Sequence, residues 1–105
     1  MCTKAQLATL LLSIFATSAA LAQDAATLNT RSLAATCASC HGTDGRTTAG
    51  SAIPALAGMP RDYMLTQMKA FRDGSRPATV MHQIAKGFAE QQLEAVAAYF
   101  ATLKR

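Results

Sequence analysis

The sequence predicts a small all-α domain, because apolar residues recur at helical spacing in segments that glycine and proline separate. Met64, Met68 and Phe71 follow one another at steps of four and three residues, which places them on one helix face. The last segment repeats this pattern with Leu93, Val96, Phe100 and Leu103. We therefore expect amphipathic helices over residues 60–73 and 90–103.

Two shorter helices and one long loop complete the expected domain. A helix that begins at Asn29 or Thr30 is expected to run to Cys37, after a loose leader. A second short helix is expected over residues 78–86, where a glycine follows it. Residues 42–58 contain four glycines, three threonines, a serine and a proline, so they predict an irregular loop.

Residues 1–22 have the features of a cleaved secretory signal peptide. Lys4 supplies a positive charge, residues 7–16 form a short apolar run, and Ala20-Leu21-Ala22 fits a cleavage site. The apolar run is too short for a comfortable membrane span. We therefore expect a mature domain of residues 23–105 that is exported to the periplasm and has no membrane span.

The charge of the chain is mildly basic and dispersed. Ten lysines and arginines against six acidic residues give a net charge of +4. Proteins that bind nucleic acid through charge carry a basic patch or stripe, whereas these residues are scattered along the sequence. The pattern therefore indicates solvated faces and argues against a nucleic-acid-binding protein.

The chemistry of the chain is concentrated in one Cys-x-x-Cys-His motif, formed by Cys37, Cys40 and His41. This spacing is the attachment motif for a c-type haem. One helical turn separates the thiols, so each can form a thioether with one vinyl group, and His41 can bind the iron as proximal ligand. The carbonyl of Pro54 is the candidate acceptor for the other His41 nitrogen. A covalent haem c would also stabilise so short a domain, whose own side chains form only a small core.

Two other interpretations of the cysteine pair fit the sequence less well. A thioredoxin-like dithiol site follows a buried strand, and no alternating β-branched run precedes Cys37. A structural zinc site would have to draw on Cys37, Cys40, His41 and His82. Adjacent Cys40 and His41 do not easily turn onto one tetrahedral ion, so the motif favours haem.

Met81 and His82 are the candidates for the sixth iron ligand. The other methionines of the mature chain are expected to pack in the protein: Met59, Met64 and Met68. Met81 stands at the start of a very short helix, and Ile84 and Ala85 would continue an apolar face with it. His82 would then face solvent, so we expect Met81 to be the ligand.

A His41–Met81 pair would leave no open position on the iron, which suits transfer of single electrons. Ligation by two histidines, with His82 in the sixth position, would lower the reduction potential. We expect one cavity for the haem. Its expected lining is Cys37, Cys40, His41, Leu56 and Met81.

Over nearly all of residues 23–105 the sequence resembles class I bacterial cytochromes c. The segments that carry the resemblance are Cys37–Gly42, Ile53–Gly58, Thr79–Phe88 and Ala98–Phe100. The resemblance implies an all-α fold of three to five helices wrapped around one covalent haem, in which the first and last helices cross. It also implies that Pro54 accepts the hydrogen bond from His41 and that Met81 is the distal ligand.

The region from Met81 to Phe88, with the last helix ending in Tyr99 and Phe100, is similar to the haem subunit of flavocytochrome c sulfide dehydrogenase. That resemblance implies a flavoprotein partner that takes electrons from sulfide and hands them to the cytochrome. The chain departs from larger members because it has a single Cys-x-x-Cys-His motif. We therefore expect an electron-transfer subunit that is not catalytic alone.

Two alternatives stay open from the sequence. A freely diffusing cytochrome c that feeds a terminal oxidase or reductase would have the same motif, and only the presence or absence of a flavoprotein partner separates it from a subunit. A haem enzyme or gas sensor would need a vacant or easily displaced sixth ligand, which a firmly bound Met81 would not provide.

Overall fold

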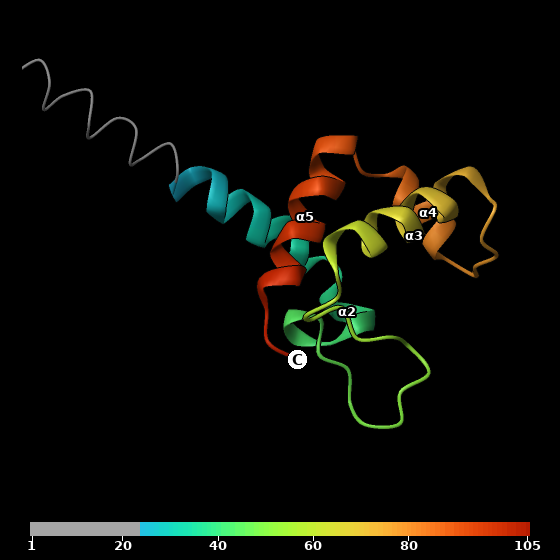
Figure 1. Ribbon diagram of the computed structural model, residues 1–105, viewed down its shortest axis with the longest axis horizontal. Helices are drawn as coiled ribbons and strands as arrows, with labels where there is room; N and C mark the ends of the chain where they lie inside the picture. Colours follow the sequence, from blue (N-terminus) through green and yellow to red (C-terminus); the bar gives the residue numbers. More distant parts are fainter. Residues whose placement is uncertain (1–23) are drawn as a thin grey trace, which may run out of the picture.

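The computed structural model describes residues 24–105, which form helices joined by loops, with no β-strand among them. A helical segment over residues 24–35 comes first. The elements that follow are α2 (Ala38–His41), the 3₁₀ helix η1 (Thr43–Gly45), α3 (Arg61–Asp73), α4 (Met81–Lys86) and α5 (Glu90–Thr102) (Figure 1). The all-α prediction is confirmed. The expected signal peptide, residues 1–22, lies outside the described residues.

The first helical segment differs from the prediction, because the chain is already helical at residue 24 and has no loose leader there. The Thr30 hydroxyl donates to the carbonyl of Ala26 at 3.0 Å, so this side chain bonds back into the helix instead of capping it. Ala25 and Ala26 favour helix in their own right. Residues 24–29 are exposed and project away from the other helices (Figure 1).

The two long helices have their predicted ends to within one residue. Pro60 precedes the first residue of α3, and Gly74 ends it with a left-handed φ of 84°. Ala89 precedes α5 and has no side-chain group that could cap it. Its backbone N–H donates instead to the side-chain oxygen of Gln92 at 2.8 Å, which is one half of a capping box.

The core forms where the first helical segment, α3 and α5 meet. Its buried members are Ala34, Met64, Val96, Ala97 and Phe100. Met59 and Met68 pack against this cluster, so the prediction that these methionines and Met64 are packing residues is confirmed. Because Ala34 lies in the same cluster as residues of α5, the first and last helices are in contact, as the resemblance implied.

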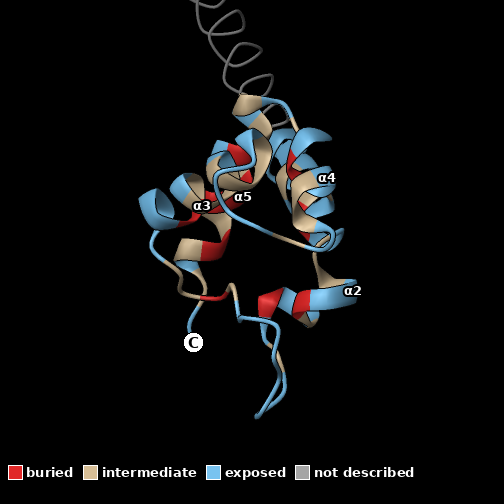
Figure 2. Ribbon diagram, turned by 90° about the vertical axis from the view of Figure 1, so that its right-hand side faces the viewer, coloured by how far each residue is buried: buried red, intermediate tan, exposed pale blue. Residues whose placement is uncertain are grey.

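The short helix α4 begins at Met81, three residues later than predicted, and Gly87 follows it as expected. Thr79 and Val80 are β-branched residues with low helix propensity, which accounts for the late start. Helix α4 packs against α3, and in Figure 2 it stands beside α3 and α5 while α2 lies below them. In residues 24–105 no helix is both long and apolar enough to cross a membrane.

Candidate haem-binding site

The two cysteines of the motif are placed by a single turn of helix. Cys37 precedes α2 in a helical conformation, and the backbone N–H of His41 donates to its carbonyl at 3.0 Å. Residues three apart on such a turn share a face, so Cys37 and Cys40 present their thiols to the same side. Cys37 is half-buried and Cys40 is exposed, and neither forms a disulfide bond. Burial raises the pKa of the Cys37 thiol, against an opposing hydrogen bond from Thr36.

His41 is oriented by a backbone carbonyl. Its side chain is 8% exposed, and its Nδ1 lies 2.7 Å from the carbonyl oxygen of Pro54. A carbonyl can only accept, so Nδ1 carries the proton and the lone pair of a neutral ring is on Nε2. An imidazole held in this way is a metal ligand through Nε2. The structure therefore brings His41 and Pro54 together in the arrangement expected for a proximal haem ligand.

The loop that carries Pro54 is anchored by Gly45. The carbonyl of Gly45 accepts hydrogen bonds from the backbone N–H groups of Leu56 at 2.8 Å and Ala57 at 3.1 Å. Gly45 has a left-handed φ of 70°, and a Cβ there would lie 2.8 Å from the Cβ of Leu56 and 2.9 Å from the Phe100 ring. The next turn is tied to α5, because Gly58 donates to the Phe100 carbonyl at 2.9 Å. These contacts fix the Pro54 carbonyl relative to the core.

Met81 and His82 lie on different sides of α4. Ile84 and Ala85 follow Met81 by three and four residues, so the three side chains lie on one side of the helix, as predicted. Ala85 is fully buried and Ile84 is 39% exposed. His82 is offset from Met81 by about 100° around the helix, and its Nδ1 is sealed from solvent.

His82 is less exposed than predicted, because it is half-buried rather than turned fully to solvent. Its Nδ1 has no hydrogen-bond partner among the described residues, and the side chain lines a groove of about 270 Å³ together with Phe71, Pro77 and Lys86. The reason is the packing of α4, which turns the His82 face toward the end of α3. A buried ring nitrogen without a partner destabilises the folded state, typically by about 1–3 kcal/mol.

The surroundings of the motif fit a large apolar cofactor. Ile53, Val80 and Ile84 are 39%, 53% and 39% exposed, although each is a strongly apolar residue. Ile53 adjoins Pro54, and Val80 and Ile84 lie on either side of Met81 in the sequence. Apolar side chains that remain exposed beside a ligand set are expected where an apolar ring covers them. Together with the two cysteines, which form no disulfide bond, and the oriented His41, they fit a haem c.

A cavity of about 560 Å³ does not have the lining predicted for the haem. It is bordered by the loop residues Ala55, Ala57 and Met59, by Tyr63 of α3, and by Arg105. None of the predicted residues lines this cavity or the groove beside His82: Cys37, Cys40, His41, Leu56 and Met81. The loop after the motif and the end of the chain enclose this space, and their meeting is a tertiary contact that the sequence pattern did not predict.

Arg72 and Glu90 were not singled out from the sequence, yet they join the element that carries Met81 to the rest of the fold. Arg72 donates to the Glu90 carboxylate at 3.0 Å and to the carbonyls of Ala85 and Phe88. The two charged residues are 18 positions apart. An arginine in the last turn of a helix ordinarily indicates only a favourable interaction with the helix dipole.

Comparison with known proteins agrees with the geometry. The family model for cytochrome c matches residues 29–104. The cytochrome subunit of sulfide dehydrogenase of Chlorobaculum tepidum is 40% identical over 73 residues, which are 70% of this chain and 64% of that protein. The thiosulfate dehydrogenase electron acceptor of Thiomonas intermedia is 39% identical over 71 residues, 68% of this chain and 33% of that protein.

A third relative, cytochrome c4 of Pseudomonas aeruginosa, is 41% identical over 71 residues, 68% of this chain and 35% of that protein. The chain therefore spans less than two thirds of the length of each of these three relatives. The matched region includes the Cys-x-x-Cys-His motif and the helices around it, so the similarity extends over the whole candidate site.

Cytochromes c carry haem c on thioether bonds from such a cysteine pair, and they transfer electrons. Cys37 and Cys40 fit that attachment, and the haem is therefore covalently bound in this protein. The family match covers most of the described residues, and the orientation of His41 fits the proximal ligand of such a haem. The chain belongs to the cytochrome c family.

Proposed function

We propose that the protein is an exported, single-haem electron carrier in which His41 and Met81 are the two axial iron ligands. The observation that carries this proposal is the 2.7 Å hydrogen bond between His41 Nδ1 and the Pro54 carbonyl, because it leaves Nε2 as the coordinating atom. Residues 1–22 would direct export, and residues 23–105 would form the mature periplasmic domain.

The residues of the chain hold and tune the metal rather than react with a substrate. Haem c, when bound, supplies a one-electron redox couple. Donation from His41 Nδ1 makes its Nε2 a stronger donor to iron, and the Met81 thioether is a soft ligand that raises the reduction potential relative to a second histidine. If His41 and Met81 both hold the iron, small molecules would have no open site to bind.

Electrons would enter and leave near Cys40. Ser39 and Cys40 are exposed on α2, and Ala38 beside them is small. Side chains of this size allow the redox centre of a partner to approach the thioether edge of the haem closely. Contacts of redox partners are typically small and transient, so a modest exposed surface around Cys40 is sufficient.

The partner supported best is a flavoprotein that oxidises sulfide. The support is the 40% identity to the cytochrome subunit of a sulfide dehydrogenase and the resemblance of residues 81–88 to that group of proteins. In this role the chain would accept electrons that the flavoprotein takes from sulfide. It would not break or form bonds in the substrate itself.

The proposal is tested by isolating the protein under gentle conditions from its own periplasmic extract and measuring the ratio of flavin to haem. A dehydrogenase subunit is expected to remain with about one flavin per haem through size exclusion, and sulfide should then reduce the haem. Haem without flavin in a small monomer would contradict the subunit assignment.

A diffusible electron acceptor is the second candidate, favoured by the 39% identity to a thiosulfate dehydrogenase electron acceptor. Such a carrier would pass electrons from a dehydrogenase to a terminal oxidase or reductase. The same isolation separates the two: a flavin-free monomer that a separate dehydrogenase reduces would support the carrier.

A further inference from the structure

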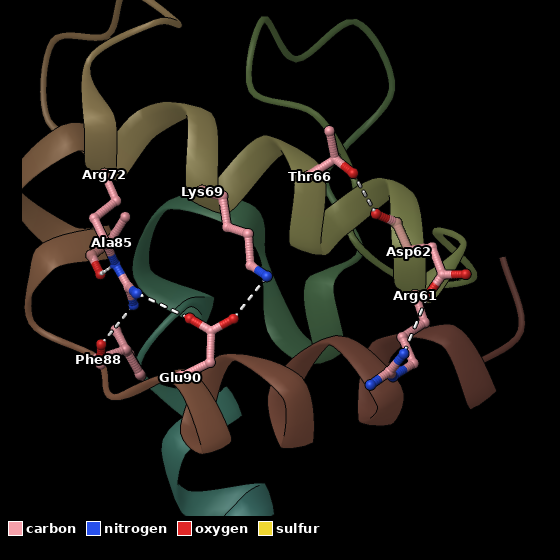
Figure 3. Close-up of polar contacts among 8 residues, drawn as sticks. All are labelled: Arg61, Asp62, Thr66, Lys69, Arg72, Ala85, Phe88 and Glu90. Carbon is pink, nitrogen blue, oxygen red and sulfur yellow. Dashed lines mark hydrogen bonds and ion pairs between the residues drawn. The ribbon is translucent and has the colours of Figure 1, made fainter.

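Arg72, in the last turn of α3, joins three parts of the fold through one side chain (Figure 3). Its Nε donates to the carbonyl of Ala85 at 3.3 Å, and its Nη2 donates to the carbonyl of Phe88 at 2.7 Å. Its Nη1 donates to the Glu90 carboxylate at 3.0 Å. The guanidinium therefore holds the end of α4, the connection after it and the start of α5.

Helix α4 depends on such contacts because it is only six residues long. A helix of this length is not stable by itself in water, and the last carbonyls of any helix lack partners within it. The N–H of Gly87 satisfies the carbonyl of Ile84 at 3.0 Å, and Arg72 satisfies the next one, of Ala85. Arg72 is thus a side-chain cap for the C-terminal end of α4.

Glu90 keeps the Arg72 guanidinium in place. One of its carboxylate oxygens pairs with Arg72 at 3.0 Å and the other with the Lys69 ammonium at 2.7 Å (Figure 3). Lys69 and Arg72 are three residues apart and lie on the same face of α3. An exposed ion pair contributes little alone, but here it is combined with two hydrogen bonds to backbone carbonyls. The combination gives the side chain one defined geometry.

Met81 is the first residue of α4 and lies about one helical turn before Ala85. Fixing the end of so short a helix also fixes its first residue. We propose that Arg72 is a positioning residue for the distal ligand, which holds α4 against α3 and so keeps the Met81 thioether on the haem iron. This inference rests on the proposed role of Met81 as the sixth ligand.

The test compares Arg72→Met and Arg72→Lys with the matched control Arg61→Met in the haem-loaded full chain. Arg61 lies on the same helix and pairs with Asp62 at 3.1 Å, an interaction confined to α3 (Figure 3). Arg61→Met therefore removes the same charge without loosening α4. Lysine at position 72 can still pair with Glu90, but it cannot donate as a planar fork to two carbonyls as well.

The first measurement is the rate at which imidazole binds to the ferric protein, since imidazole can enter only when the thioether has left the iron. We expect Arg72→Met to bind imidazole at least about tenfold faster than the wild type, which corresponds to about 1.4 kcal/mol. The imidazole-binding rate of Arg72→Lys should lie between those of Arg72→Met and the wild type, and the rate of Arg61→Met should equal that of the wild type. Equal rates in Arg72→Met and the wild type would overturn the inference, as would equal acceleration in Arg61→Met.

A second measurement separates positioning from general stability. Urea titration follows the near-red charge-transfer band of ferric haem with a thioether ligand and, in parallel, the circular dichroism of the helices. In Arg72→Met the band is expected to disappear at a lower urea concentration than the helical signal. Simultaneous loss of both signals would contradict a positioning role. If Arg72→Met does not fold, the same two signals are compared in Arg72→Lys and Glu90→Gln.

The result for the wild type distinguishes this inference from the proposed function. A wild-type protein without the charge-transfer band would overturn the assignment of Met81 as ligand, and the inference with it. A wild-type protein with the band, combined with unchanged imidazole binding in the Arg72 variants, would overturn only the role of Arg72.

Discussion

One backbone carbonyl decides which nitrogen of His41 is available to the iron. The Pro54 oxygen can only accept a hydrogen bond, so the proton is on Nδ1 and Nε2 is the donor atom. Proline suits this position because it has no N–H to satisfy and its ring limits the movement of the carbonyl. At the scale of the residue, the proposed proximal ligand is therefore oriented by a residue 13 positions away.

Gly45 offers a sharp test at the same scale, because its left-handed backbone lies directly under Leu56 and Phe100. Gly45→Ala is expected to lower the free energy of unfolding by about 3 kcal/mol, from the backbone conformation and the overpacking together. The matched control is Gly50→Ala. Gly50 has a similar φ of 80° with nothing within 4 Å of an added Cβ, so only the backbone cost of about 1 kcal/mol is expected.

Urea unfolding of both haem-loaded variants measures this difference. Equal destabilisation by the two alanines would show that the contacts of Gly45 with Leu56 and Phe100 do not constrain the loop that holds Pro54.

At the scale of the elements, the ion pairs of Glu90 couple the α3–α5 contact to pH. The Lys69 ammonium, and after it the Arg72 guanidinium, hold the pKa of the Glu90 carboxyl below its ordinary value. A lowered pKa in the folded state adds stability above the pKa of the unfolded chain, and this contribution is lost as the pH falls through the folded value. The loss is therefore expected below a pH of about 4.3.

Glu90→Gln is expected to reduce the fall in unfolding free energy between neutral pH and a pH of about 3, because the variant has no carboxylate to protonate at this position. Glu94→Gln, which removes an exposed carboxylate farther along α5, is the matched control. Urea titrations at several pH values measure the effect. An unchanged pH dependence in Glu90→Gln would show that the ion pairs with Lys69 and Arg72 do not stabilise the fold.

The elements differ in how far the sequence could predict them. The ends of α3 and α5 follow from local signals, such as Pro60 and Gly74, and were predicted to within a residue. The start of the first helical segment was not predicted correctly. A threonine such as Thr30 can either cap a helix or bond back into one, and only the structure distinguishes these two roles. Likewise the burial of His82 depends on the packing of α4 against α3.

The site divides in the same way. Cys37, Cys40 and His41 are adjacent in sequence, so their chemistry is visible as a motif. Met81 shares its helix face with Ile84, as expected from their spacing. The ion pair between Arg72 and Glu90 joins two helices through side chains, and such a contact has no periodic pattern in the sequence that could predict it. The larger cavity, beside Tyr63 and Arg105, likewise depends on where distant segments meet.

At the scale of the whole molecule, we expect a domain this small to depend on the haem for its core. The buried cluster contains only one aromatic residue, Phe100, and two of its other members are alanines. Folded domains of this size bury a modest share of their surface and ordinarily need a staple. The exposed Ile53, Val80 and Ile84 are the surfaces that we expect the haem to cover.

The double variant Cys37→Ala with Cys40→Ala is therefore expected to lose covalent haem and most of its helical structure. Haem staining after denaturing electrophoresis tests the attachment, and far-ultraviolet circular dichroism tests the fold. The Cys2→Ala variant serves as the control, since Cys2 lies in the expected signal peptide and would be absent from the mature chain. A haem-free double variant with an undiminished helical signal would show that the polypeptide folds without its cofactor.

The absorption spectrum of the ferric protein tests the His41–Met81 ligand pair most directly when Met81→Ala and His82→Ala are compared. Met81→Ala is expected to lose the near-red charge-transfer band of thioether ligation, and His82→Ala is expected to keep it. A Met81→Ala protein whose ferric spectrum is the same as that of the wild type would rule out Met81 as an iron ligand.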